Sequence, residues 1–215
     1  MNPRATKLLQ VNYFLVLLAL GCGGKKSSQT PVLQPTAPLP TAGLTGQRVA
    51  LTPLALVAAE DTLHWDALIA DRRRTLDQCD SIISALLAAR APEVTWVGPT
   101  ELRHIARRAV PLAADPDQLG TPFLRAGNVI DVPDPLRYQL RTLMGLVGGR
   151  YALIPAGLVF RHPTVGSTGA TAELSVVMID SRVGRVGWRT IARGEGPDAW
   201  TALTRAMKNL TPGLP

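Results

Sequence analysis

The chain has 215 residues, and its 23 lysines and arginines outnumber its 16 acidic residues, which gives a formal net charge of +7. Its two cysteines exclude a scaffold held by several disulfides, and its three histidines form no HExxH pattern and accompany no CxxC pattern. The C-terminal stretch of about 170 residues has a length that suits a single hydrophobic core.

The N-terminus has the layout of a secretory signal peptide. Residues 2–7 carry Arg4 and Lys7 without an acidic residue, and a mostly apolar stretch follows from Leu8 to Leu20. That stretch is too short to span a bilayer, which takes about 20 helical residues. No polar stripe at helical spacing marks it as an amphipathic core helix. We therefore expect residues 1–21 to be a signal peptide that is removed on export.

Residues Ala19 to Cys22 read Ala-Leu-Gly-Cys and resemble the lipobox of bacterial lipoproteins. The resemblance implies cleavage between Gly21 and Cys22 and attachment of lipid to Cys22. A thiol can form the thioether to a glyceride, and several acyl chains hold a protein firmly because each buried methylene contributes about 0.8 kcal/mol.

Loss of the signal peptide would lower the formal net charge to +5, because Arg4 and Lys7 leave with it. Acylation of Cys22 would leave Cys79 as the remaining thiol, so no intramolecular disulfide is expected. We expect Cys79 to be a small buried residue on a helix, with a redox role as the alternative. Gly23 differs from the aspartate that retains enterobacterial lipoproteins at the inner membrane. The resemblance therefore implies a lipid anchor in the outer membrane facing the periplasm, with the inner membrane or the cell surface as alternatives.

Residues 22–46 are expected to form a lipidated tether. The segment is rich in proline, serine and glycine and has too little apolar surface to fold. An extended tether gains about 3 Å per residue, so it could place the domain tens of ångströms from the membrane. The remainder, residues 47–215, is predicted to be one α/β domain.

The first half of that domain is predicted to hold two strands and two helices. Residues 48–57 are apolar and predict a strand, which Pro53 places at a sheet edge or at the strand's end. Residues 66–89 predict a helix whose apolar positions recur every three or four residues. Those positions are Leu76, Cys79, Ile83 and Leu86, and Asp80 falls outside them. A short strand is expected at 94–98, then a helix capped by Thr100 and ending near Ala109.

The second half is predicted to begin with a proline-rich loop over 110–134, which is either functional or loosely ordered. A helix from Pro135 to Leu146 follows and is ended by Gly148 and Gly149. Three strands come next, with Gly184 in a hairpin between the last two. The three strands span 151–160, 171–180 and 186–193, and a helix over 198–210 closes the chain.

This order, β-α-β-α-α-β-β-β-α, predicts an α/β sandwich with a mixed sheet. The chain resembles the domain shared by the TolB amino-terminal domain and the curli-secretion and penicillin-binding-protein-activator lipoproteins. The segments that carry the resemblance are "VALTPL" at 49–54, "VTWVGPTEL" at 94–102, "ALIPAGLVF" at 152–160 and "VVMIDSRVGRVGW" at 176–188. The resemblance covers about residues 47–210, departs at the loop 110–134, and implies an accessory role without catalysis.

The motifs that suggest catalysis are incomplete. Ser167 in "VGSTG" has Val165 where the nucleophile elbow needs glycine, and "GLVGGR" at 145–150 lacks the Lys-Ser/Thr pair of a P-loop. Aspartates in the long loop allow at most a weak cation site, and turn formation is the favoured interpretation. These aspartates are Asp115, Asp117, Asp131 and Asp134. We assign no catalytic residue, no cofactor site and no metal ligand.

Basic residues gather on the first two predicted helices. They are Arg72, Arg73 and Arg74 on the first helix and Arg103, Arg107 and Arg108 on the second. Arg103 and Arg107 are four residues apart and repel each other unless an anion lies between them. Compensation by neighbouring aspartates is the favoured interpretation. The alternative is contact with an anionic partner, either the phosphates of lipid or cell-wall polymer or an acidic protein surface.

We therefore expect a membrane-anchored envelope lipoprotein that works as a non-enzymatic binding or assembly accessory module. Nucleic acid is not an expected partner on the exported side, and the oligomeric state stays open. An oligomeric secretion or channel component is the main alternative, and an envelope hydrolase is less favoured. A channel needs spare strands of about 9–11 residues to cross the membrane, and none lies outside the predicted core sheet.

Overall fold

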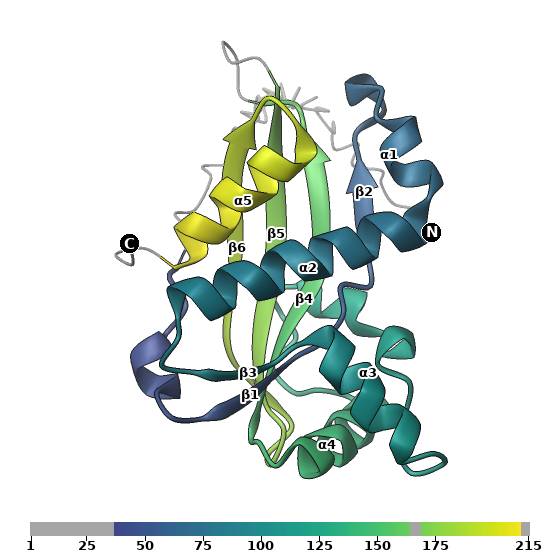
Figure 1. Cartoon of the computed structure of the whole chain (residues 1–215), viewed down its shortest axis with the longest axis vertical. Coiled ribbons are helices and arrows are strands. Elements are labelled where there is room, and N and C mark those ends of the chain that lie inside the picture. The colour runs from purple at the N-terminus through teal and green to yellow at the C-terminus, as the bar shows by residue number, and fades with distance from the viewer. Residues whose placement is uncertain (1–36, 164–168, 212–215) are drawn as a thin grey trace, which may run out of the picture. The chain divides into compact units, whose positions relative to one another are not determined.

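The computed structural model describes residues 37–163 and 169–211. Gly21, Cys22, Ser167 and most of the predicted tether lie outside these residues. The described chain is built on one mixed sheet with the strand order β3-β1-β4-β5-β6, and β2 also pairs with β4 (Figure 1). Its strands are β1 (Arg48–Leu51), β2 (Val57–Ala59), β3 (Thr95–Val97), β4 (Tyr151–Arg161), β5 (Ala170–Asp180) and β6 (Arg185–Gly196). The first three pair in parallel with a neighbour and β4, β5 and β6 form an antiparallel meander, which confirms the predicted α/β fold with a mixed sheet.

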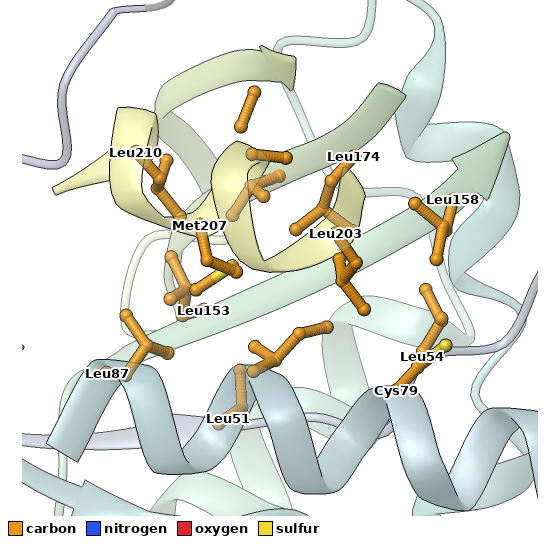
Figure 2. Close-up of a cluster of buried hydrophobic side chains, with 14 of the residues drawn as sticks. Leu51, Leu54, Cys79, Leu87, Leu153, Leu158, Leu174, Leu203, Met207 and Leu210 are labelled. Atoms are coloured by element: carbon orange, nitrogen blue, oxygen red, sulfur yellow. The ribbon is translucent and has the colours of Figure 1, made fainter. Parts of the chain in front are cut away.

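Helices cover both faces of the sheet. They are α1 (Asp66–Ala70), α2 (Arg72–Arg90), α3 (Pro99–Arg108), α4 (Leu136–Val147) and α5 (Ala199–Leu210). One buried cluster joins α2 and α5 to the sheet, as Figure 2 shows, and the other joins α3, α4 and the loop 110–134 to the opposite face. The alternation of β1 builds both clusters, because Val49 and Leu51 enter the first and Ala50 enters the second. No helix in the described ranges is both long and apolar enough to cross a membrane.

Pro155 lies at a β-bulge in the middle of the sheet. The register between β4 and β5 shifts between Pro155 and Gly157, so one extra residue is inserted into β4. The insertion reverses the alternation, and Leu153 and Leu158 therefore both enter the cluster with α2 and α5 (Figure 2). Proline has no N–H to donate, and a bulge tolerates that loss in a central strand.

The strand predicted over 48–57 is instead two strands. β1 ends at Leu51 and β2 begins at Val57, and both pair with β4 along the same side. Pro53 interrupts the chain between them, and the N–H of Leu54 donates to the Asp80 carboxylate rather than to a strand. β1 lies between β3 and β4, so Pro53 marks a strand end and not a sheet edge.

The predicted helix over 66–89 is also divided. Asp71 separates α1 from α2, and its side chain accepts a hydrogen bond from the N–H of Arg74, which caps α2. Thr100 is not the cap of α3, because α3 already begins at Pro99 and Gly98 holds the cap position. Proline suits the first position of a helix, where its missing N–H has no partner within the helix.

The loop 110–134 packs closely on the domain. Leu119, Leu124 and Val132 are buried in the cluster with α3 and α4. Two short 3-10 helices, Pro116–Gln118 and Thr121–Arg125, organise the middle of the loop. Of the two interpretations offered by the sequence, loose order is therefore wrong, and the loop forms one wall of the core.

The packed body begins earlier than the predicted boundary at residue 47. Leu39 and Leu44 are buried in the cluster beneath α2 and α5, and the N–H of Leu39 donates to the carbonyl of Leu210 at 2.8 Å. A tether that ends at residue 46 is therefore too long. Two leucines at the end of a proline-rich segment supply enough apolar surface to hold it on the domain.

Candidate binding surface on helices α2 and α3

An ion-pair network joins α2, α3 and the loop 110–134. Asp117 lies in the loop and contacts an arginine of each helix, because Arg73 approaches it at 3.3 Å and Arg103 at 2.8 Å. The network therefore brings together the two runs of arginine that the sequence placed on separate helices.

Arg103 is the centre of this network. Its side chain is 14% exposed and lies against the three carboxylates of Asp77, Asp80 and Asp117. Nε donates to both oxygens of Asp117 at 3.0 Å, and Nη2 donates to Asp80 at 2.9 Å. Because its donors already bind aspartates of α2 and of the loop, Arg103 holds α3 to α2. Its position therefore does not support the prediction that it contacts an anion of a partner.

Asp80 is the most buried carboxylate of the network, with 5% of its surface exposed. Burial raises its pKa to about 6, although hydrogen bonds from the Leu54 N–H and Arg103 work in the other direction. Burial also raises the pKa of Asp117, but the guanidinium groups of Arg103 and Arg73 outweigh that effect and hold it below its usual value. Asp80 lies off the apolar stripe predicted for α2, yet it is buried and accepts the backbone N–H of Leu54, which follows Pro53 outside any strand.

A hollow of about 640 Å³ lies beside this network, and Asp80, Ser84 and Thr100 are among its lining residues. Both Asp80 oxygens accept hydrogen bonds from the protein, and the Ser84 hydroxyl donates to the carbonyl of Asp80. The Asp80 carboxylate thus holds α2, α3 and the turn after β1 together, while the Ser84 hydroxyl bonds within α2. Over the described ranges, no group of histidine, cysteine and acidic side chains is arranged to hold a metal ion.

Cys79 is fully buried on α2, as predicted. Burial raises the pKa of its thiol to about 12, with the neighbouring Asp80 charge as a smaller cause. The thiol therefore stays protonated at neutral pH and lacks the thiolate that redox chemistry needs. Its position favours the packing role over the redox alternative.

The remaining predicted arginines divide into two groups. Arg73 pairs with Asp77 at 3.0 Å, and Arg72 donates to the carbonyl of Ala55 at 2.7 Å. The side chains of Arg74, Arg107 and Arg108 are exposed and form no ion pair with any residue in the described part of the chain. Compensation by aspartate thus applies to Arg73 and Arg103 but not to these three.

The sequence indicated Asp117 as a turn residue or weak cation ligand but missed its pairing with Arg73 and Arg103. It lies 14 positions after Arg103, beyond the spacing at which helical side chains meet. The sequence feature that could have indicated its position is the turn at Asp115. The Asp115 side chain accepts a hydrogen bond from the N–H of Asp117 and caps a short 3-10 helix. That cap fixes the Asp117 backbone, and the carboxylate then lies against the two helices.

The end of α3 combines charge with exposed apolar surface. Arg107 and Arg108 form its last turn, and Val110 and Leu112 follow in the loop, each 71% exposed. We call these four residues the α3 tip; the helix ends in the lower right of Figure 1. Val110 and Leu112 are the most exposed large hydrophobic residues in the described part of the chain. Two unpaired cations beside two exposed aliphatic side chains make this a candidate contact surface.

No family model and no curated protein sequence matches the chain. Solved structures with a similar arrangement include the LpoB C-terminal domain from Salmonella enterica, at 14% identity and TM-score 0.41 over 71% of this chain and 84% of that one. Lipoprotein GNA1162 from Neisseria meningitidis is similar at 12% identity and TM-score 0.35 over 70% and 81%. The PelC dodecamer subunit from Paraburkholderia phytofirmans is similar at 14% identity and TM-score 0.35, over 83% of this chain and 94% of that one. Likeness at this level carries no conclusion about partner or activity, and the lipobox and family resemblance of the sequence stay predictions.

Proposed function

We propose that this chain is a lipid-anchored protein of the bacterial cell envelope that acts as a non-enzymatic accessory module and contacts its partner through the α3 tip. The observation that carries the proposal is the tip itself, where Arg107 and Arg108, which form no ion pair within residues 37–163 and 169–211, are followed by exposed Val110 and Leu112. Arginine is enriched among the residues that dominate protein interfaces. The signal-like N-terminus and the lipobox-like residues before Cys22 support the location.

The partner that fits the α3 tip is a protein with an acidic rim around an apolar recess. Val110 and Leu112 need an apolar surface to leave water, and the two guanidinium groups favour carboxylates beside it. A bilayer is the weaker candidate, because two aliphatic side chains bury little surface and the tip has no aromatic residue of the kind that anchors at membrane interfaces.

Site-specific crosslinking tests this contact. A photocrosslinking residue at position 112 of the full chain in intact cells is expected to give one discrete protein adduct. Replacing Arg107 and Arg108 with glutamine is expected to weaken that adduct, most clearly at low ionic strength, where exposed charges are screened least. A crosslinker at Tyr138, which is 66% exposed on α4, is the matched control and is expected to give no such adduct. Adducts formed only with lipid would refute the protein-contact proposal. A protein adduct of equal yield in the wild type and the double glutamine variant would refute it as well.

The anchor has its own test. Replacing Cys22 with serine is expected to abolish incorporation of labelled fatty acid and to leave an unprocessed or soluble exported form, since a hydroxyl cannot form the thioether. Replacing Cys79 with serine is the control and is expected to leave labelling unchanged. Undiminished labelling of the Cys22→Ser chain would contradict lipid attachment at this residue.

A further inference from the structure

A second concentration of arginine lies away from α2 and α3. A solvent-open hollow of about 800 Å³ is bounded by the start of β1, the end of α4 and the turn between β5 and β6. Four arginines from these separate segments line it: Arg48, Arg141, Arg150 and Arg182. Among the residues that line the hollow, none is acidic. The volume lies within the range of small-molecule sites, roughly 300–1,000 Å³.

The local backbone explains how the start of β1 and the end of α4 come to line one hollow. Gly148 ends α4 in a left-handed conformation, and Gly149 follows directly against β1. A Cβ at Gly149 would lie 2.5 Å from the carbonyl oxygen of Arg48 and 2.8 Å from the methyl of Met144. Glycine therefore lets the start of β1 approach the end of α4. Arg48 then donates through Nη1 to the carbonyl of Val147 at 3.1 Å.

The charges in the hollow are only partly compensated. Asp180 lies beside it and accepts from Arg150 and from the backbone N–H of Arg182. The C-terminal end of α4 adds a partial negative charge of about one half. Arg141 and Arg182 form no ion pair with any residue in the described ranges, and Arg48 uses one donor on a carbonyl. Cations that line one hollow repel one another, so an added anion among them is favoured.

We propose that this hollow binds a phosphate group, with Arg141 and Arg182 as its main ligands and Arg48 as a supporting donor. A guanidinium presents its donors in a planar fork that matches two phosphate oxygens. The volume leaves room for an organic substituent beside the phosphate. That phosphate belongs either to a soluble phosphorylated compound or to a lipid headgroup, since both present the same oxygens.

Titration calorimetry on the full chain in detergent tests the site with two probes. Inorganic pyrophosphate represents the soluble source, and monomeric dihexanoyl phosphatidylglycerol represents the headgroup, with dihexanoyl phosphatidylcholine as its zwitterionic comparison. We expect saturable binding of one or both anionic probes. Replacing Arg141 and Arg182 together with glutamine is expected to weaken that binding by about tenfold or more, because charge-assisted hydrogen bonds are lost.

The Arg107→Gln, Arg108→Gln chain is the matched control, because it makes the same charge change at the α3 tip. We expect it to bind the probes like the wild type, which separates this site from the proposed partner contact. Binding of pyrophosphate alone supports the site with a soluble ligand, and binding of phosphatidylglycerol alone supports it with a lipid headgroup. Absence of binding to both anionic probes, or equal weakening in the two double variants, overturns the proposal.

Discussion

Replacing Gly194 with valine is expected to force α5 off the sheet and to destabilise the domain strongly. A Cβ at Gly194 would lie 2.1 Å from the backbone nitrogen of Ala206 and 2.6 Å from the carbonyl oxygen of Ala202. Both atoms belong to the backbone of α5, so no side-chain rotation relieves the clash. Displacing the helix would expose Leu203, Met207 and other core residues of Figure 2. We expect a loss of at least about 3 kcal/mol, a large part of the roughly 5–15 kcal/mol of a typical domain.

Gly187 offers a matched control on the same strand. A Cβ there meets only the carbonyl oxygen of Met178 at 3.9 Å, which is ordinary contact. The added side chain therefore has room, so Gly187→Val is expected to leave the urea midpoint of the full chain near that of the wild type. Urea unfolding followed by circular dichroism compares the three chains. A Gly194→Val chain that unfolds at the wild-type urea concentration would show that α5 does not pack against β6 at this residue.

Elements that depend on local periodicity were predictable from the sequence. The apolar runs of β4 and β5, the glycine of the hairpin at Gly184 and the apolar stripe of α4 all depend on residues close in the chain. These predictions needed no information about which distant segments meet.

The features missed by the sequence depend on distant contacts. Asp80 lies off the apolar stripe of α2, but it is buried and accepts the backbone N–H of Leu54, which lies 26 residues before it in the chain. Arg103 looks like one of several surface arginines, but Asp117 in the loop removes it from the surface. Arg48, Arg141 and Arg182 are far apart in the chain, and only the meeting of α4 with β1 and the hairpin makes them one site. In each case the residue type indicated a charged side chain, and the tertiary contacts determined which groups that side chain meets.

Replacing Arg103 with glutamine is expected to be the most damaging change among the six predicted arginines. It removes the guanidinium that contacts Asp77, Asp80 and Asp117, and Asp80 then holds a buried charge without a cation. Breaking a buried ion pair from one side typically costs about 3–5 kcal/mol. Arg107→Gln is the control, because Arg107 lies one turn further along α3 and is exposed. We expect the control to stay within about 0.5 kcal/mol of the wild type.

The loss caused by Arg103→Gln is expected to depend on pH. The pKa of Asp80 is raised from 3.8 to about 6, so the folded state binds its proton more tightly than the unfolded state. The contribution of Asp80 to stability is therefore fully present below pH 3.8 and is lost as pH rises through about 6. Without Arg103 the pKa of Asp80 rises further, because the Arg103 contacts lower it. The stability contributed by Asp80 is then lost over a range that extends to higher pH. The difference in the free energy of unfolding between Arg103→Gln and the wild type should therefore widen from pH 5 to pH 7.5, by an amount on the order of 1 kcal/mol.

Urea denaturation of both full chains at pH 5 and pH 7.5 measures this gap. Adding Asp80→Asn to each chain removes the titrating group, and the widening with pH is then expected to disappear. The lowered pKa of Asp117 also depends on Arg103, but Asp117 is ionised at both pH values in the folded protein. Its loss of a partner therefore lowers stability equally at the two pH values. A gap of the same size at pH 5 and pH 7.5 would show that Arg103 does not control the ionisation of Asp80.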